Sequence, residues 1–518
     1  MITNAPTVAV VGGGALGSAL VGALVDRLSS ERARTWARRP RIVLFERSER
    51  VGRGLAYAKD ASSYLLNTSA QTMSVVPGRR SHFFEWLGER GLAPVDEGPH
   101  FCARQLFGDY VEDCFARTVD KAKRRGIVVS TTHDEVAALA PRPSGGYRVV
   151  TRGHAPVDAD VVVLAVGNLP SNRFRALEGP GFIASPYPSD ALRTRIPAHA
   201  RVGILGTGLS AIDAALALVA GGHEGPVTMA SRSGLLPTVR GPLHDHELAH
   251  VTRANVARAT EQGRRPLRWE TILRWLELEL EAHGQSVSWD RDFPAWVDPK
   301  EHLSREVAAA EGGARLWQSI GEALNPMMDV LWHHLASEDR RIFLDRFRSR
   351  FMSHWVPIPL VTARRVLALL RDGRLGVERG LSDVTREATR DEAAGACSLR
   401  LGARSAEVDV VIDATGTARH LSEIDSPLLE ALLRQGTIAA HDAGGVRVAF
   451  ESLRVLGAEG RSDPSLFALG NLTCGTHLFT STLDLNVEKA DRVAAHVEGE
   501  LHRRNEKQRH VDATPHSS

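Results

Sequence analysis

A glycine-rich turn that follows a short apolar strand constrains this chain more than any other feature. Residues Thr7–Val11 are rich in β-branched side chains, which is typical of a buried parallel strand, and Gly12-Gly13-Gly14-Ala15-Leu16-Gly17 follows at once. The apolar spacing within Ala15–Leu28 predicts a helix. A G-x-G-x-x-G sequence between a strand and a helix indicates a dinucleotide-binding β-α-β unit.

Each glycine of this first turn has its own physical role. Gly12 permits the tight turn, Gly14 lets the backbone approach a pyrophosphate, and Gly17 allows the helix to pack closely on the strand. The helix that follows offers backbone N–H groups and a partial positive charge to the phosphates.

An acidic residue ends the second predicted strand of this unit. Residues 41–46 form that strand, and Glu46 stands where an acid accepts hydrogen bonds from an adenosine ribose. The spacing is longer than usual because the arginine-rich residues 30–40 form a surface insertion. The alternative interpretation is a glycine-rich turn with an unrelated surface glutamate.

A second unit of the same kind starts at the strand Val202–Leu205. Gly206-Thr207-Gly208-Leu209-Ser210-Ala211 is a G-x-G-x-x-A turn, and residues 210–220 and 227–230 are the expected helix and next strand. Arg232 replaces the ribose-binding acid, and a guanidinium there can bind a 2′-phosphate that an acid would repel. This predicts a preference for NADPH over NADH of about ten- to a hundredfold. The alternative is a solvated surface arginine.

The repeated pattern predicts an α/β protein with two Rossmann-like dinucleotide-binding domains and a largely helical insertion. Helical periodicity is clear around residues 267–283 and 315–335. A chain of 518 residues exceeds one hydrophobic core. We expect the FAD domain at 1–200 and 417–501, the NADPH domain at 201–240 and 351–416, a helical insertion with the substrate region at 241–350, and a disordered tail at 502–518.

Composition narrows the classes of function. The formal net charge is only +2 and no long basic block is present, which argues against nucleic acid as a partner. The four cysteines form no C-x-x-C pair, which argues against a disulfide reductase and suits a reducing compartment. Because no uninterrupted apolar segment has membrane-spanning length, we expect a cytoplasmic protein without a membrane partner. The oligomeric state stays open.

One cluster has metal-like composition, namely His244, Asp245, His246 and His250. A metal needs convergent ligands, and this spacing does not guarantee convergence, so we expect no metal site. Trp355, with Pro357 and Pro359 close by, lines a ligand site or belongs to the core.

Motifs along most of the chain, in a consistent order, carry a family resemblance. They are Val10-Val11-Gly12-Gly13-Gly14, Phe45-Glu46-Arg47, Gly52-Arg53-Gly54-Leu55-Ala56-Tyr57, Leu65-Leu66-Asn67 with Met73-Ser74, Phe107-Gly108-Asp109, the second turn with Ser231-Arg232-Ser233-Gly234-Leu235-Leu236-Pro237, and Leu466-Phe467-Ala468-Leu469-Gly470-Asn471-Leu472-Thr473. With them the chain resembles the bacterial FAD/NAD(P)-binding flavoprotein family. That family is related to the two-dinucleotide flavin monooxygenases, which include amine N-hydroxylases. The resemblance is weakest in residues 241–350.

The resemblance implies FAD, NADPH and molecular oxygen, with a hydroperoxyflavin that oxygenates the amino group of a small amino acid or amine. By position it implies that Gly12, Gly14, Gly17 and Glu46 hold the FAD adenosine and pyrophosphate, and that Gly206, Gly208, Ser210 and Arg232 hold NADPH. It also implies that Asn67, Asn471 and the segment from Thr473 to Thr482 approach the isoalloxazine, with Thr473 as a flavin-proximal candidate. The cofactor-binding set is completed by Ala15, Leu16, Arg47, Gly54, Leu209, Gly416 and Gly470.

Two departures and two other functions bear on this interpretation. The Baeyer–Villiger fingerprint F-x-G-x-x-x-H-x-x-x-[WF] is missing before the second turn, and Asn471 stands where many flavoenzymes carry aspartate. The first alternative is a dehydrogenase, oxidase or electron-transfer flavoenzyme that uses the same cofactors without inserting oxygen. The second is a non-catalytic flavin-binding sensor or scaffold, against which the intact second turn argues.

Overall fold

The computed structural model describes residues 5–30, 36, 39–60, 64–93, 98–313, 315–386 and 396–513, and it divides into two compact units. Unit 1 comprises Met1–Ala58, Thr68–Ser171 and Ala418–Ser518, and unit 2 comprises Lys59–Asn67 and Asn172–Thr417. The first boundary therefore falls at residue 171 and not near 200, and no unit boundary separates residues 241–350 from their surroundings.

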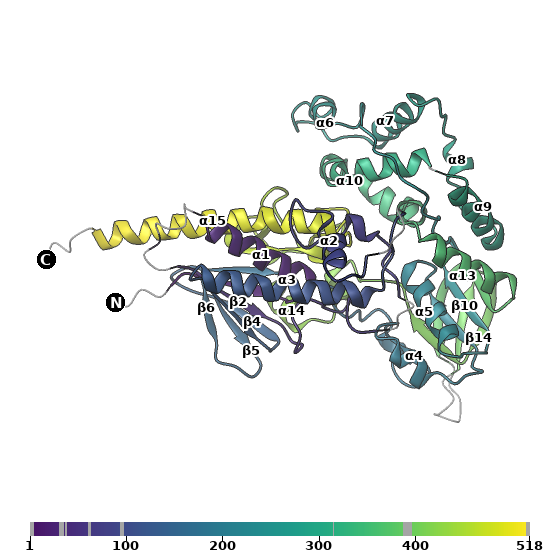
Figure 1. Ribbon diagram of the computed structural model, residues 1–518, viewed down its shortest axis with the longest axis horizontal. Coiled ribbons are helices and arrows are strands. Elements are labelled where there is room, and N and C mark those ends of the chain that lie inside the picture. Colours follow the sequence, from purple (N-terminus) through teal and green to yellow (C-terminus); the bar gives the residue numbers. More distant parts are fainter. Residues whose placement is uncertain are drawn as a thin grey trace. The chain divides into compact units, whose positions relative to one another are not determined.

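Unit 1 is built on a six-stranded, mainly parallel sheet (Figure 1). Only the edge pair β16–β17 is antiparallel. The strand order is β16 (Arg454–Leu456), β17 (Ser462–Ala468), β7 (Val161–Leu164), β1 (Thr7–Val11), β2 (Arg41–Phe45) and β3 (Val128–Thr132).

Alternating side chains of β1 supply two separate cores. Val8 and Val10 are buried with apolar residues of α1 (Ala15–Leu28) and α15 (Leu483–Ala513), which lie side by side (Figure 1). Ala9 and Val11 face the opposite core, which is completed mainly by β4 (Val136–Pro141), β5 (Tyr147–Thr151), β6 (Val157–Ala159) and α14 (Pro427–Arg434). Because both faces are covered, the sheet is buried, as expected for parallel strands. The unit also contains α2 (His82–Glu89) and α3 (Arg104–Arg124).

Unit 2 repeats this plan with a five-stranded parallel sheet. Its order is β11 (Leu375–Arg379), β10 (Val227–Ser231), β9 (Val202–Leu205), β15 (Val410–Asp413) and β8 (Phe182–Ile183). One face packs on α5 (Leu209–Ala220), α9 (Pro299–Glu311) and α13 (Leu360–Arg371), beside which lies α4 (Asp190–Arg195). The other face packs on an antiparallel sheet of β12 (Leu381–Arg386), β13 (Cys397–Leu401) and β14 (Arg404–Val408).

The described part of residues 241–350 contains helices and no named strand. Besides α9 these are α6 (Arg253–Ala259), α7 (Trp269–Glu281), α8 (Trp289–Asp292), α10 (Leu316–His334), α11 (Ser337–Ile342), a π-helical turn over Phe343–Phe347, and the start of α12 (Arg348–Trp355). The elements α7 and α10 fall on the two stretches of helical periodicity in the sequence.

The prediction of a disordered tail is wrong for residues 502–513, because α15 continues to Ala513. The helix is anchored by Val493, Val497 and Leu501, which recur at helical spacing and are fully buried. Beyond Leu501, Arg504 pairs with Glu500 one turn earlier at 3.1 Å, which extends helical stabilisation into the charged segment. Residues 514–518 lie outside the described residues, as do residues 31–35, 37 and 38 of the arginine-rich stretch.

In the part of the chain that the structure describes, no helix is both long and apolar enough to cross a membrane.

Candidate dinucleotide-binding sites

The first glycine turn closes so tightly that two of its glycines cannot carry a side chain. Gly12 has a φ of +107°, and a Cβ there would lie 2.3 Å from the Ala165 carbonyl oxygen at the end of β7. A Cβ on Gly17 would lie 1.9 Å from the Gly12 carbonyl oxygen. Both distances are far below van der Waals contact, so these glycines fix the course of the chain from β1 into α1.

Gly14 differs, because a Cβ there would meet only the Gly54 backbone, at 3.5 Å. It is the N-cap of α1 and offers no side-chain cap, and the first turn of the helix carries no acidic residue. Gly54, with a φ of +54°, approaches from the other side, and Gly52 N–H donates to the Gly13 carbonyl at 2.7 Å. The first N–H groups of α1, which have no acceptor within the helix, and the two bare backbones suit an anionic group such as a pyrophosphate.

Glu46 lies at this same edge of the sheet, directly after β2. Its Oε2 accepts a hydrogen bond from Gly13 N–H at 2.8 Å, and its Oε1 accepts from Ser48 N–H at 2.9 Å. The carboxylate is thus tied to the glycine turn, and ribose binding by Glu46 stays a prediction. Arg47 is exposed beside it.

The end of β17 brings a further group of predicted residues to the same edge. Gly470 has a φ of +68° and faces Leu16 of α1, since a Cβ there would lie 3.1 Å from Leu16 Cδ2. Asn471 donates to Asn168 Oδ1 and accepts from the Thr480 hydroxyl at 2.9 Å. Asn168 follows β7 and was missed as a site residue, although its position after a buried strand signalled it.

The hydroxyl of Thr473 forms a hydrogen bond within the chain. The residue has no exposed surface, and its hydroxyl donates to the Gly470 carbonyl at 2.9 Å. The proximity of Thr473 to the isoalloxazine stays a prediction, and the hydroxyl of this residue is engaged by the Gly470 carbonyl. Asn67 belongs to unit 2, and its Oδ1 is buried without a hydrogen-bond partner among the described residues.

The second glycine turn repeats the geometry of the first. Gly206 has a φ of +111°, and a Cβ there would lie 2.7 Å from the Ala414 carbonyl at the end of β15. Gly208 caps α5 without a side-chain bond and has open space around it. Leu209 and Ser210 then form the first helical residues. This arrangement fits a second phosphate group at the N-terminus of α5.

A loop after β10 is held next to the second turn. The Thr207 hydroxyl donates to the Leu235 carbonyl at 2.7 Å and lies 3.0 Å from the Ser231 hydroxyl. Ser231 in turn accepts from Gly234 N–H at 2.9 Å. These bonds fix the loop that carries Arg232, whose side chain is exposed and has no partner among the described residues.

Arg379 is a second guanidinium at this edge and was missed by the sequence analysis. It ends β11 in register with Ser231, and Gly380 N–H donates to the Arg232 carbonyl at 3.1 Å. Its guanidinium lies over the Trp296 ring at 4.6 Å, and 41% of Trp296 is exposed. The pairing of β10 with β11 joins Ser231 to Arg379, 148 positions later. This pairing brings Arg379 close to Arg232.

Residues at the end of β15 border the same turn. The Asp413 carboxylate accepts from both the N–H and the hydroxyl of Thr415, at 2.9 and 2.7 Å. Burial raises the pKa of Asp413, and the bonds from Thr415 partly offset that rise. Gly416 follows with a φ of +86°, which lets the chain turn away from the site.

The histidine cluster is part of the scaffold of the helical region. His246 is buried with its Nε2 3.8 Å from Glu279, and Glu279 accepts backbone N–H bonds from Ala249, His250 and Val251. The structure therefore ties this loop to α7 through a carboxylate. Among the described residues, no three His, Cys, Asp or Glu side chains converge as a metal site would require.

Comparison with known proteins agrees with this geometry. Residues 9–169, which include the first glycine turn, match the model of a family described as FAD-NAD(P)-binding. The uncharacterized protein YdhS of Escherichia coli (strain K12) is 23% identical over 449 residues, which cover 76% of this chain and 82% of that protein.

Several solved structures share the fold over almost the whole chain. The ornithine hydroxylase PvdA from Pseudomonas aeruginosa, in its reduced form, has a TM-score of 0.57 at 15% identity and covers 96% of this chain and 100% of its own. The L-lysine 6-monooxygenase from Pseudomonas syringae has a TM-score of 0.55 at 18% identity, with 96% and 99% covered. The ornithine N-hydroxylase KtzI from Kutzneria sp. 744 has a TM-score of 0.52 at 17% identity, with 98% and 100% covered. The predicted fold class, with two dinucleotide-binding domains, is confirmed.

Proposed function

We propose that this protein is an FAD-dependent, NADPH-consuming monooxygenase that oxygenates the amino group of a small amino acid or amine. The observation that carries the proposal is the recurrence of one turn geometry in two units. Gly12 and Gly206 have the same unusual backbone conformation, and each abuts the carbonyl that ends a neighbouring strand. A protein with two dinucleotide sites is built to pass electrons from one cofactor to another.

The residues of unit 1 fit FAD. The bare backbones of Gly14 and Gly54 leave room for a pyrophosphate beside the N-terminus of α1, and Glu46 supplies a carboxylate for the ribose. Gly470 and Asn471 follow β17 at the same edge and extend the site along it. The family description for residues 9–169 supports this assignment.

The residues of unit 2 fit NADPH. Gly206 and Gly208 would hold the pyrophosphate at the N-terminus of α5, and the exposed guanidinium of Arg232 would bind the 2′-phosphate. Arg379 adds a second positive charge from the next strand. The KtzI structure, named as a complex with reduced FAD, NADP+ and L-ornithine, supports the same pair of cofactors.

When bound, FAD would take a hydride from NADPH and give two electrons to molecular oxygen, of which one atom enters the substrate and the other leaves as water. The chain's own contribution is to bind both nucleotides and the amine and to keep them in place. We also propose that the protein works in the cytoplasm, since Cys102, Cys114, Cys397 and Cys474 are free thiols.

The test is stopped-flow absorbance of the purified flavoprotein, reduced with NADPH without oxygen and then mixed with oxygenated buffer and a panel of amino acids and amines. We expect a transient near-ultraviolet band that decays faster with the true substrate, and a product that carries one atom from isotopically labelled oxygen. Direct return to oxidised flavin, with hydrogen peroxide equal to the NADPH consumed in every case, would instead identify an oxidase.

A further inference from the structure

Arg240 is an arginine of unit 2 whose backbone is fixed on two sides. Its N–H donates to the Ile358 carbonyl at 2.8 Å, and the N–H of the next residue, Gly241, donates to Gln318 Oε1 of α10 at 2.9 Å. Gln318 also donates to the Val239 carbonyl at 2.8 Å. The segment is therefore held between α10 and the connection from α12 to α13, and the Arg240 side chain starts from a rigid base.

The side chain of Arg240 is partly buried and makes no hydrogen bond or ion pair with the described residues. Its Nε is inaccessible to solvent and makes no hydrogen bond, and none of the described residues forms an ion pair with this side chain. Burial lowers the pKa of Arg240. Two other covered arginines are compensated: Arg315 pairs with Glu306, and Arg53 pairs with Asp109 and Glu112.

A partly buried guanidinium without a hydrogen-bonded anion is costly, because a desolvated charge needs a counter-charge and hydrogen-bond acceptors in contact with it. An arginine in this state is matched by a carboxylate, which accepts two parallel N–H bonds from the guanidinium fork. The ligand that would satisfy Arg240 therefore carries a small planar anion.

The groups next to Arg240 add a second requirement. Glu322, one turn after Gln318 on α10, acts on Arg240 electrostatically. Asn325 donates to Glu322 at 3.1 Å, and Trp355 donates its indole N–H to Asn325 at 3.1 Å. The carboxylate of Glu322 disfavours a multiply charged anion such as a phosphate and favours a ligand with a positive group near its carboxylate.

We propose that Arg240 and Glu322 recognise the α-amino carboxylate group of an amino acid, with Arg240 binding the carboxylate and Glu322 the ammonium. Asn325 orients Glu322, and the Trp355 ring, stacked on Phe351 at 4.9 Å, forms the adjoining apolar wall. That this ligand is the molecule to be oxygenated rests on the proposed function. The binding of this ligand is independent of the proposed function, because every residue named lies in unit 2 and binding requires no electron transfer.

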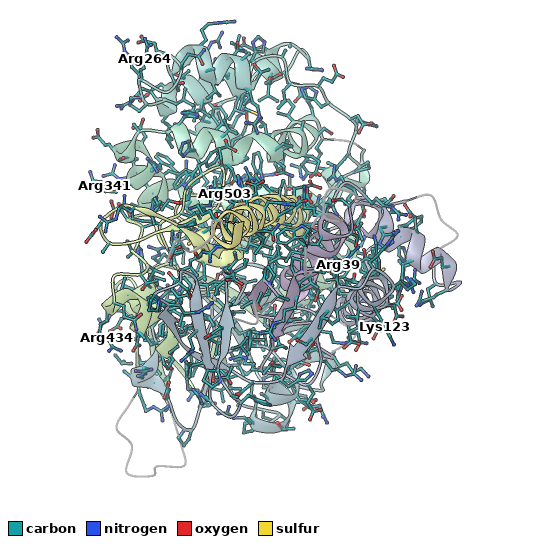
Figure 2. The ribbon with its side chains drawn as sticks, turned by 90° about the vertical axis from the view of Figure 1, so that its left-hand side faces the viewer. Arg39, Lys123, Arg264, Arg341, Arg434 and Arg503 are labelled. Atoms are coloured by element: carbon teal, nitrogen blue, oxygen red, sulfur yellow. The ribbon has the colours of Figure 1, made fainter. Side chains whose placement is uncertain are left out.

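The experiment is a binding measurement on the full-length flavoprotein without NADPH. Isothermal titration calorimetry is run with the proteinogenic amino acids and L-ornithine, each paired with its α-carboxamide, which keeps the ammonium but lacks the carboxylate. We expect at least one amino acid to bind about ten- to a hundredfold more tightly than its amide. In Arg240→Gln the ratio of the dissociation constants of the amide and the amino acid should fall to about one, whereas Arg240→Lys should keep part of the preference. Arg264→Gln, at an exposed arginine of the same helical region (Figure 2), should bind like the wild type.

The outcomes separate this inference from the proposed function. If no amino acid binds, if acid and amide bind equally, or if folded Arg240→Gln keeps the preference, the inference is wrong whatever the flavin does. If Arg240→Gln weakens NADP+ binding and leaves amino-acid binding unchanged, Arg240 serves the nucleotide and the inference is also wrong. If binding follows the expectation but NADPH drives no oxygenation of the bound amino acid, the site stands and the proposed function fails.

Discussion

At the scale of single residues, glycines of the same motif perform different tasks. Gly17 is a packing glycine, because its missing side chain makes room for the Gly12 carbonyl. Gly14 is a ligand glycine, because a Cβ there meets nothing closer than 3.5 Å in the protein itself. The sequence motif predicts these two roles, and the structure adds the distances that tell a packing position from an open one.

Substitution should separate these tasks. Gly17→Ala forces a Cβ to within 1.9 Å of a carbonyl oxygen, so we expect a loss of about 3 kcal/mol or more in the free energy of unfolding. Gly14→Val should fold with near-native stability in the absence of flavin and lose flavin binding. Thermal unfolding of the flavin-free proteins and the flavin-to-protein absorbance ratio measure the two effects. Full flavin occupancy in Gly14→Val would contradict the pyrophosphate site.

The choice between NADPH and NADH should depend on Arg232. Arg232→Ala should raise the KM for NADPH about tenfold or more and leave the KM for NADH nearly unchanged, because only NADPH carries the 2′-phosphate. Arg379→Ala should act in the same direction, since Arg379 lies on the adjacent strand. Steady-state flavin reduction measures both constants, with the exposed Arg264→Ala as the control. Equal changes for the two nucleotides would remove the 2′-phosphate contact.

The sequence predicted the site residues that lie within a local motif, and it missed those that are placed by contacts between distant segments. The glycines of both turns, Glu46 and Arg232 follow from the strand–turn–helix pattern alone. Arg379 depends on a strand pairing between distant parts of the chain. The burial of Thr473, with its hydroxyl turned to Gly470, depends on how the segment after β17 coils, which no local pattern encodes.

At the scale of elements, α7 holds a loop of the helical region through one carboxylate. Glu279 is almost fully buried and accepts N–H bonds from three consecutive residues, 249–251, at 3.2, 2.7 and 3.0 Å. Burial alone would raise its pKa, but the backbone donors outweigh burial and lower the pKa below the ordinary 4.5.

Glu279→Gln should destabilise the helical region by about 1–3 kcal/mol at neutral pH. The amide oxygen of glutamine is a weaker acceptor than a carboxylate, and the amide NH2 group would face the backbone N–H groups of residues 249–251. The depressed pKa means that this contribution is complete above the ordinary carboxyl pKa and is lost as the pH falls through the folded-state value. The difference between wild type and variant should therefore shrink below about pH 4.5. Denaturant unfolding followed by helical circular dichroism measures it, and the half-exposed Glu281→Gln is the control. A difference independent of pH would contradict this account.

The elements themselves were largely predictable where two signals coincide. The strands β1 and β9 have the predicted bounds because a β-branched run ends at a glycine turn. The end of α15 was not predictable, because a charged, low-hydropathy segment has the composition of a disordered tail. The buried residues that initiate the helix lie upstream, so helix propagation carries it into residues 502–513.

At the scale of the whole molecule, each unit is assembled from separated segments. Unit 2 includes Lys59–Asn67, more than a hundred residues before the rest of it. Within this unit the Asp60 carboxylate accepts from Ser189 N–H at 2.8 Å, and the Tyr64 hydroxyl donates to the Pro186 carbonyl at 3.1 Å. Such contacts between distant segments leave no periodic signal, so the sequence predicted two nucleotide domains but assigned this segment to the wrong one.

The division into units predicts where each nucleotide acts. A ligand that binds only the folded form stabilises the region that contains its site. NADP+ added to the flavoprotein should therefore slow backbone hydrogen exchange at the second turn, around residues 206–211 and 231–234, and at Arg379 in unit 2. Removal of FAD should speed exchange at residues 12–17, 46–54 and 470–471 in unit 1.

Exchange measured by mass spectrometry distinguishes the two assignments peptide by peptide. Arg232→Ala supplies the matched control, because at a limiting concentration of NADP+ it should weaken the protection by NADP+ while leaving the effect of FAD intact. If NADP+ instead protected the first turn, or if FAD removal exposed the second, the nucleotides would have to be exchanged between the units. The proposed direction of electron flow, from unit 2 to unit 1, would then be reversed, although the two-site architecture would remain.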